Sequence, residues 1–223
     1  MSGTEPRSRG RGILVAVEGI DGAGKSTLLA GLGHAMRRRG YSVRQRREPA
    51  DRTIGRLAQE AGATDPWTGA VYFTVDRHLA APQLRADLRR FDLVLSDRSF
   101  YSTIAYQGSR LPPRDRARLV QLQTGATVPP DLVLLLDLPV SWLRRRLTER
   151  RASRGPLERS RLLAGVARSY RRLARQGRWV VLDARQPRAE LLRSAVRALE
   201  THGLPGQGRG KRLRARRGPR GPR

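Results

Sequence analysis

The 223-residue chain contains no cysteine, which excludes disulfide bonds, thiolate catalysis and cysteine-bound metals. Its three histidines are scattered and lack the spacing of metal ligands (His34, His78 and His202). The most apolar run, residues 132–136, is far shorter than the roughly 20 residues that span a bilayer. Residues 1–12 are polar and lack the apolar segment of a secretory signal. These absences predict a cytoplasmic protein with no membrane partner.

Lysine is almost absent, since all 46 basic residues are arginine except Lys25 and Lys211. Lys25 lies in residues 19–26, GIDGAGKS, which fit the phosphate-binding pattern G-x-x-x-x-G-K-[ST] and follow the apolar run 13–17. A compact ammonium reaches between the β- and γ-phosphates of a nucleotide, whereas a planar guanidinium needs more space. The pattern therefore predicts an enzyme that acts on nucleotide phosphates.

In such a loop the backbone N–H groups and the positive end of the following helix face the phosphates, and the hydroxyl after the lysine can bind Mg²⁺. Asp97 ends an apolar strand, a position from which a carboxylate can approach the same magnesium ion. Ser26 and Asp97 are therefore the predicted metal ligands. The predicted ATP-binding residues are Gly19, Ile20, Asp21, Gly22, Ala23, Gly24, Lys25, Ser26 and Thr27.

Apolar runs of strand length alternate with amphipathic helical stretches, which is typical of a parallel sheet covered by helices. The sequence predicts an α/β fold of the P-loop NTPase class, a three-layer sandwich with a five-stranded parallel sheet, helices on both faces and a mobile lid. The predicted strands are 13–18, 41–47, 91–97, 132–137 and 179–183. The predicted helices are 25–39, 53–61, 65–90, 100–107, 112–125, one from Pro139, 157–176 and 187–199.

The net charge is +27, and it is still +19 without residues 203–223, which hold eight basic residues and no acidic ones. A charge of this size attracts polyanions, although an arginine-rich composition with solvated helix faces gives the same balance. We expect a disordered N-terminal extension (1–12), one P-loop domain (13–200) and a basic disordered tail (201–223). The tail is a candidate for non-specific contact with nucleic acid.

Phosphoryl transfer needs positive charge around the acceptor phosphate and the moving group. Arg98, beside Asp97, and Arg77, on the long predicted helix, are candidates. Residues 149–156 form a loop-like stretch between two predicted helices. We expect a mobile lid over about residues 149–158 that closes over the phosphates and excludes water, with Arg150, Arg151 and Arg154 as catalytic candidates. Because twelve arginines and only two glutamates lie between residues 144 and 175, most of these arginines belong to a solvated charge run.

Several ordered motifs resemble those of the thymidylate kinases, which are P-loop nucleoside monophosphate kinases. The resemblance covers about residues 13–199. The matching segments are residues 18–27 (the family's EGxDGxGKST), 47–49 (REP), Phe73 with Arg77 (F-x-x-x-R), 97–108 (DRYxxSxxAYQG), 130–137 (PDLxxxLD) and Tyr170 after the lid.

The resemblance implies an ATP-dependent kinase that converts dTMP to dTDP with Mg²⁺ and forms a homodimer. It implies that Phe73 stacks on thymine and that Arg77 hydrogen-bonds the base. Family members without arginine in the phosphate loop supply one from the lid, and loop positions 20–23 hold none here.

The resemblance further implies that Arg98 holds the monophosphate with Glu48 nearby. Asp21 would meet the sugar 3′-hydroxyl or the metal side of the acceptor, and Tyr106 would crowd a ribose 2′-hydroxyl. The implied dTMP-binding residues are Asp21, Glu48, Phe73, Arg77, Arg98, Tyr106 and Gln107. The implied catalytic residues are Lys25, Arg98, Asp21, Arg150, Arg151 and Arg154.

Three positions depart from the family pattern. Ser99 stands where the family has the tyrosine of DRY, Ala50-Asp51 replaces the glycine pair after REP, and the lid has no clear D-R-x-E, with Glu158 as the candidate glutamate. Two alternatives therefore stay open. One is a kinase of the same fold with another, modified deoxynucleoside monophosphate as acceptor. The other, which rests on the net charge of +27 and the arginine-rich tail, is a nucleic-acid-binding protein that has kept a P-loop fold.

Overall fold

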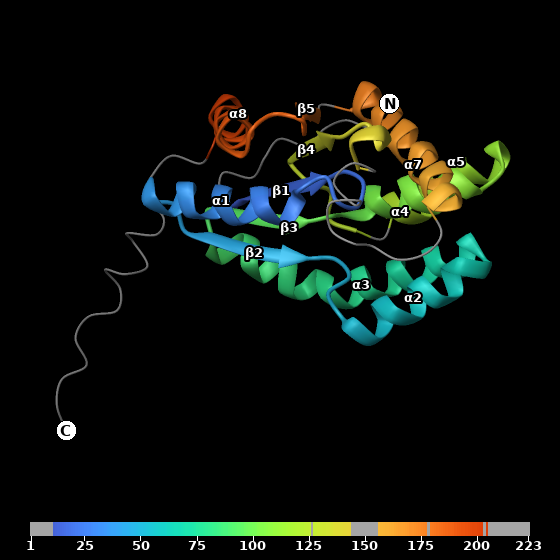
Figure 1. Cartoon of the computed structure of the whole chain (residues 1–223). Coiled ribbons are helices and arrows are strands. Elements are labelled where there is room, and N and C mark those ends of the chain that lie inside the picture. Colours follow the sequence, from blue (N-terminus) through green and yellow to red (C-terminus); the bar gives the residue numbers. More distant parts are fainter. Residues whose placement is uncertain (1–10, 126, 144–155, 178, 203, 205–223) are drawn as a thin grey trace.

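The computed structural model describes residues 11–125, 127–143, 156–177, 179–202 and 204. Five strands form one parallel sheet in the order β2-β3-β1-β4-β5 (Figure 1). The predicted five-stranded parallel α/β fold is thereby confirmed. The strands are β1 (Ile13–Glu18), β2 (Val43–Arg47), β3 (Leu93–Asp97), β4 (Leu132–Asp137) and β5 (Trp179–Asp183).

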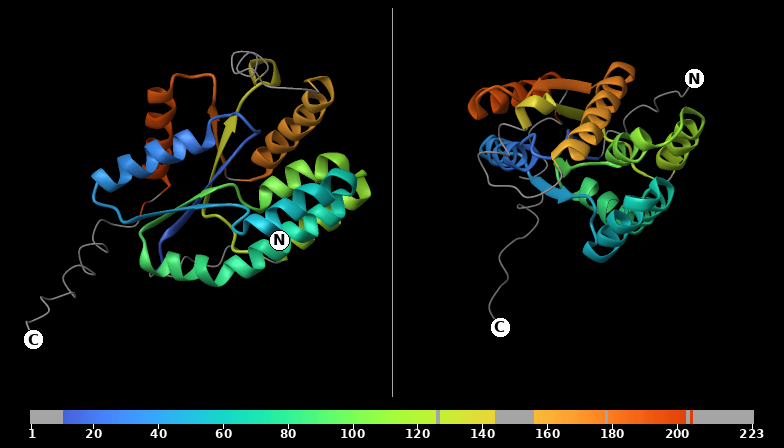
Figure 2. Two further views of the ribbon diagram at one scale, coloured as in Figure 1. Left: turned by 60° about the horizontal axis from the view of Figure 1, so that its bottom comes forward. Right: turned by 45° about the vertical axis from the view of Figure 1, so that its right-hand side comes forward.

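Helices cover both faces of the sheet, as predicted. On one face, α1 (Lys25–Arg38) packs against α8 (Arg188–Thr201) (Figure 2). The helices of the other face are α3 (Pro66–Arg90), α4 (Phe100–Tyr106) and α7 (Pro156–Gln176). Two helices stand farther from the sheet, where α2 (Arg52–Thr64) packs along α3 and α5 (Pro113–Gly125) packs along α4. The 3₁₀ helix η1 (Gly108–Arg110) joins α4 to α5.

The strand sequences explain which strands are central. β1, β3 and β4 are buried almost throughout and consist mainly of valine, leucine and isoleucine, as expected for strands covered on both faces. β2 lies at an edge of the sheet, and its sequence VRQRR turns arginines to solvent. The apolar core lies between the sheet and the flanking helices and includes Leu32, Met36 and Tyr170.

The helix predicted over residues 53–61 is too short, because α2 continues through Gly62 to Thr64. In the sequence, Gly62 is typical of the end of a helix. In the structure it lies within α2 and allows close contact between α2 and α3. A Cβ built at Gly69 of α3 would lie only 2.6 Å from the Gly62 Cα. The two glycines therefore let the backbones of α2 and α3 approach each other, which no local pattern indicates.

The predicted lid lies mostly outside the described residues. The helix expected from Pro139 is present as residues 140–143, where the description stops. It resumes at Pro156, which begins α7. Arg150, Arg151 and Arg154 therefore lie outside the described part of the chain.

Most of the two predicted terminal extensions, residues 1–10 and 205–223, also falls outside the described residues. Arg11, within the predicted N-terminal extension, pairs with Asp131 at 2.7 Å. In the described part of the chain, no helix is both long and apolar enough to cross a membrane.

Candidate active site

The phosphate loop connects β1 to α1 and relies on three glycines with positive φ, Gly19 (141°), Gly22 (83°) and Gly24 (102°). At Gly22 a Cβ would also lie 2.4 Å from Cδ1 of Leu143, so a larger residue would have to displace that side chain. Gly24 is the N-cap of α1 and has no side chain to bond the first N–H groups of the helix. These N–H groups and the helix dipole suit an anionic ligand.

Lys25 begins α1 and folds back over the loop. Its Nζ donates to the carbonyl oxygens of Gly19 (3.0 Å) and Ile20 (3.1 Å), and the residue is only 7% exposed. Burial, and after it the positive charge of Arg98, lowers the pKa of Lys25 to about 8. Negative phosphates at this position would favour the charged ammonium again.

Ser26 and Asp97, the predicted metal ligands, lie in contact. The parallel register of β1 and β3 pairs Val17 with Asp97, which brings the end of β3 beside the loop. The Ser26 Oγ donates to Asp97 Oδ2 at 2.8 Å. Hydroxyl and carboxylate oxygens are ligands that Mg²⁺ accepts, so this pair fits the ion.

Arg98 follows Asp97 with a φ of 80°, a left-handed conformation that is rare for residues other than glycine. Its side chain pairs with Asp21 of the phosphate loop and donates to Ser102 Oγ at 2.9 Å. The guanidinium also lies over the Tyr106 ring, 5.1 Å from its centroid. Backbone strain of this kind persists only where surrounding contacts hold it, and it is common at functional sites.

Tyr106 contacts both Arg98 and Asp21. Its ring lies under the Arg98 guanidinium, and its hydroxyl accepts a hydrogen bond from the Asp21 backbone N–H at 3.1 Å. Burial raises the pKa of Tyr106 to about 12, so the phenol stays neutral at ordinary pH. The structure thus brings Asp21, Arg98 and Tyr106 together, although up to 85 residues separate them in sequence.

Glu18 is a site residue to which the sequence analysis gave no role. It ends β1, is fully buried, and accepts hydrogen bonds from Ser99 N (2.7 Å), Ser99 Oγ (2.7 Å), Ser102 Oγ (2.7 Å) and Tyr170 (2.9 Å). Burial raises its pKa. An acidic residue at the end of an otherwise apolar strand was the signal that could have identified it. Ser99, at the position of the family's tyrosine, thus has a clear role, because it binds Glu18 through two donors.

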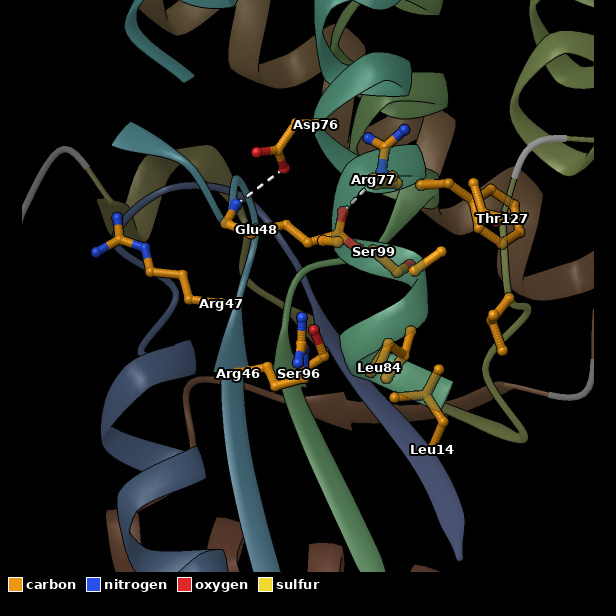
Figure 3. Close-up of a pocket in the computed structure, with 16 residues that line it drawn as sticks. Leu14, Arg46, Arg47, Glu48, Asp76, Arg77, Leu84, Ser96, Ser99 and Thr127 are labelled. Atoms are coloured by element: carbon orange, nitrogen blue, oxygen red, sulfur yellow. Dashed lines mark hydrogen bonds and ion pairs between the residues drawn. The ribbon is translucent and has the colours of Figure 1, made fainter. Parts of the chain in front are cut away.

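Arg77 lies in α3 and is only 7% exposed. Its Nε donates to Glu48 at 2.7 Å, and its two Nη atoms donate to Gln123 and Thr103. Figure 3 shows Glu48 just after the end of β2, with its carboxylate directed toward Arg77 of α3. Glu48, which the family resemblance placed near Arg98, is thus in direct contact with Arg77, another of the implied dTMP-binding residues.

Asp76 fixes the turn after β2. It accepts hydrogen bonds from the backbone N–H groups of Ala50 and Asp51, each at 2.8 Å. Asp51 in turn caps α2 by accepting from Thr53 N (2.8 Å) and Ile54 N (2.9 Å). The two residues that replace the family's glycine pair thus serve to hold the turn and to start the next helix.

Phe73 and Gln107 are two further residues that the family resemblance implies for dTMP binding. Phe73 precedes Arg77 by one turn of α3, so both side chains project from the same side of the helix. The Gln107 Oε1 is buried and has no hydrogen-bond partner among the described residues. A buried amide oxygen of this kind is an acceptor that a ligand donor can satisfy.

Two hollows border these residues. A cleft of about 830 Å³ is lined by the phosphate loop, Asp97, Arg98 and the start of α8, a size that accommodates a nucleotide. A small cavity of about 30 Å³ lies behind Glu48 and Arg77, between β1, β3 and α3 (Figure 3). The second hollow has room for about one or two water molecules and not for a base.

A family model described as Thymidylate kinase matches residues 17–196 of the chain. A curated relative from Saccharolobus solfataricus, named probable thymidylate kinase 1, is 31% identical over 188 residues, which cover 84% of this chain and 96% of the relative. A relative from Leifsonia xyli subsp. xyli, named thymidylate kinase, is 35% identical over 190 residues, which cover 81% of this chain and 90% of the relative. A relative from Metallosphaera sedula, named probable thymidylate kinase, is 34% identical over 178 residues, which cover 80% of this chain and 87% of the relative. The chain therefore belongs to the thymidylate kinase family, as its motifs predict.

Proposed function

We propose that this protein transfers the γ-phosphoryl group of ATP to dTMP, giving dTDP and ADP. The contact between Arg98 and Asp21 carries the proposal, because a cation suited to an acceptor phosphate lies against the loop suited to the donor phosphates. In this reaction an oxygen of the dTMP phosphate attacks the γ-phosphorus, and the bond to the β–γ bridging oxygen breaks. The protein's part is to align the two phosphates and to neutralise their charge.

On the donor side, residues 19–27 hold the triphosphate through backbone N–H groups, and Lys25 contacts the β- and γ-phosphates. The cleft beside the loop supports this assignment. Ser26 and Asp97 hold Mg²⁺, which supplies positive charge to the phosphate oxygens when it is bound.

On the acceptor side, Arg98 holds the monophosphate, and Asp21 meets the sugar 3′-hydroxyl or the metal side of the acceptor. Phe73 stacks on the thymine ring, and Arg77, which Glu48 orients, donates to the base. Tyr106 excludes a ribose 2′-hydroxyl, and Gln107 is the remaining contact. The contacts among Asp21, Arg98 and Tyr106 and between Glu48 and Arg77 support these roles.

A lid arginine completes the charge around the moving phosphoryl group. The candidates remain Arg150, Arg151 and Arg154, because loop positions 20–23 contain no arginine. Since these arginines lie outside the described residues, their assignment rests on the sequence alone.

A panel of nucleoside monophosphates with Mg-ATP tests the proposal. We expect turnover of dTMP, and a fall of about a thousandfold or more in kcat/KM for Lys25→Ala, because the loop ammonium stabilises charge in the transition state. The matched control is Lys211→Ala, which changes the only other lysine and leaves turnover unchanged. Turnover of another monophosphate with none of dTMP contradicts the acceptor assignment and supports the kinase with a modified acceptor.

We further propose a homodimer that forms through α3. Val71, Val75 and Leu79 recur every four residues along this helix and are 48%, 44% and 64% exposed. An apolar stripe of this kind is unusual on the free surface of a monomer and suits a second copy of the same helix. The cytoplasmic location and the contact of the tail with nucleic acid stay predictions.

A further inference from the structure

Gln123 is a buried polar residue that the sequence motifs leave without a role. It lies in α5, is 0% exposed, and accepts a hydrogen bond from Arg77 Nη1 through its Oε1. Its Nε2 donates to Thr74 Oγ1 at 2.9 Å, and Thr74 Oγ1 donates to the Ala70 carbonyl oxygen at 2.8 Å. One chain of hydrogen bonds thus runs from Arg77 through α5 and back into α3.

The direction of this chain is fixed at both ends. A guanidinium donates and never accepts, so Arg77 requires the oxygen of the Gln123 amide. The Thr74 hydroxyl gives its proton to a backbone carbonyl, so it accepts from the amide nitrogen. The reversed amide would set its NH₂ group against the guanidinium, which is also a donor. Gln123 is therefore held in one orientation, and it holds Nη1 of Arg77.

Arg77 needs such support because a buried guanidinium is costly unless its N–H groups are paired. An arginine side chain has five N–H groups. The described partners Glu48, Gln123 and Thr103 each take one of them. The two that remain belong to the Nη atoms, and they can serve a ligand.

A ligand group that meets these N–H groups must be an acceptor. At the same position of the pyrimidine ring, thymine carries a carbonyl oxygen and cytosine carries an amino group, which donates. A guanidinium locked in one orientation therefore distinguishes the two bases, whereas one that can turn away discriminates less.

We propose that Gln123 is a positioning residue that orients Arg77 for a pyrimidine with a carbonyl at this edge, and so sets acceptor affinity and base selectivity. This inference rests on the proposed function, since it assumes that Arg77 meets the acceptor base. Gln123 itself acts only through Arg77.

The test compares Gln123→Leu with Gln121→Leu, which is the same substitution at an exposed site of the same helix. Steady-state kinetics of both variants and of the unaltered protein give kcat and KM for dTMP, dCMP and ATP. For Gln123→Leu we expect KM for dTMP to rise about tenfold, because a hydrogen bond to a charged group is lost, while kcat and KM for ATP stay within about twofold. The preference for dTMP over dCMP, measured as the ratio of the two kcat/KM values, should also fall in Gln123→Leu. Gln123→Glu keeps an acceptor for Arg77 and restores most of the affinity.

A KM for dTMP that rises no more than in Gln121→Leu overturns the inference, as does a fall confined to kcat. If Gln123→Leu does not fold, Thr74→Val decides the question, because it removes the acceptor of the amide and keeps the side-chain shape. A rise of several-fold in KM for dTMP then supports the inference, and an unchanged KM overturns it. Failure of the unaltered protein to phosphorylate dTMP is a separate result, and it counts against the proposed function.

Discussion

Lys25 shows why a chain that uses arginine almost everywhere keeps a lysine in the phosphate loop. Its ammonium lies between two backbone carbonyls and near Arg98, in a position with little access to water. An arginine would stay charged there, since its pKa exceeds about 12. A lysine can lose its proton while the loop is empty, and regain it when phosphates arrive.

Donor binding should therefore depend on pH. As pH rises through about 8, Lys25 of the ligand-free protein loses its proton, so ATP binding becomes coupled to proton uptake and its affinity falls, approaching about tenfold per pH unit. Calorimetric titration with a non-hydrolysable ATP analogue, on either side of pH 8 and in two buffers of different ionisation enthalpy, measures both effects. The Lys25→Met variant should bind weakly without this slope. An affinity that does not change with pH in the unaltered protein contradicts the prediction.

The lowered pKa of Lys25 also affects the stability of the fold, which rises with pH where the ATP affinity falls. The pKa of Lys25 falls from 10.5 to about 8 on folding, so the unfolded chain binds more protons between these two values. This residue therefore adds to the stability of the ligand-free protein as pH rises across that window.

At the scale of the elements, the contact of α2 with α3 shows that a glycine can have a structural role different from the one that its local sequence predicts. Gly62 looks like a helix terminator, yet it lies inside α2, against Gly69. The close approach holds α2 beside the helix that carries Phe73 and Arg77. Packing between two helices, and not local propensity, decides the residue at this site.

Gly69→Ala should destabilise the protein. The added Cβ would lie 2.6 Å from the Gly62 Cα and 3.0 Å from the Ala58 carbonyl oxygen, so we expect a loss of about 1–3 kcal/mol in the free energy of unfolding. The control is Gly165→Ala within α7, where the nearest neighbour of the Cβ would be at 3.6 Å. That variant should gain about 0.5–1 kcal/mol from helix propensity. Urea denaturation measures both, and equal stabilities would show that α2 and α3 adjust without cost.

For the whole molecule, the exposed stripe on α3 predicts the state of assembly. We expect a dimer in solution and its dissociation in Val75→Glu, because the new carboxylates would be buried in the contact between copies. Val181→Glu is the matched control, since that valine is 52% exposed but lies on β5. Sedimentation velocity over a range of concentrations gives the mass of each. A monomer in the unaltered protein, or an intact dimer in Val75→Glu, contradicts the proposed interface.

Much of the fold and part of the site follow from the sequence. The alternation of strand and helix patterns predicts the parallel sheet, and the loop at residues 19–26 is contiguous, so its chemistry can be read directly. The proximity of Asp97 to Ser26 is also predictable, because the carboxyl ends of parallel strands meet at one edge of a sheet.

Only the tertiary structure decides the rest. The order β2-β3-β1-β4-β5 sets β1 between β3 and β4, and so buries Glu18 among donors that lie 81 or more residues away. The pairing of Arg77 with Gln123 spans 46 residues and two helices, and neither segment carries a motif for it. Local patterns fix what each segment can form, since backbone propensity and loop geometry act over a few residues. Which buried polar groups meet depends on packing, because a desolvated donor must find its acceptor wherever the fold brings one.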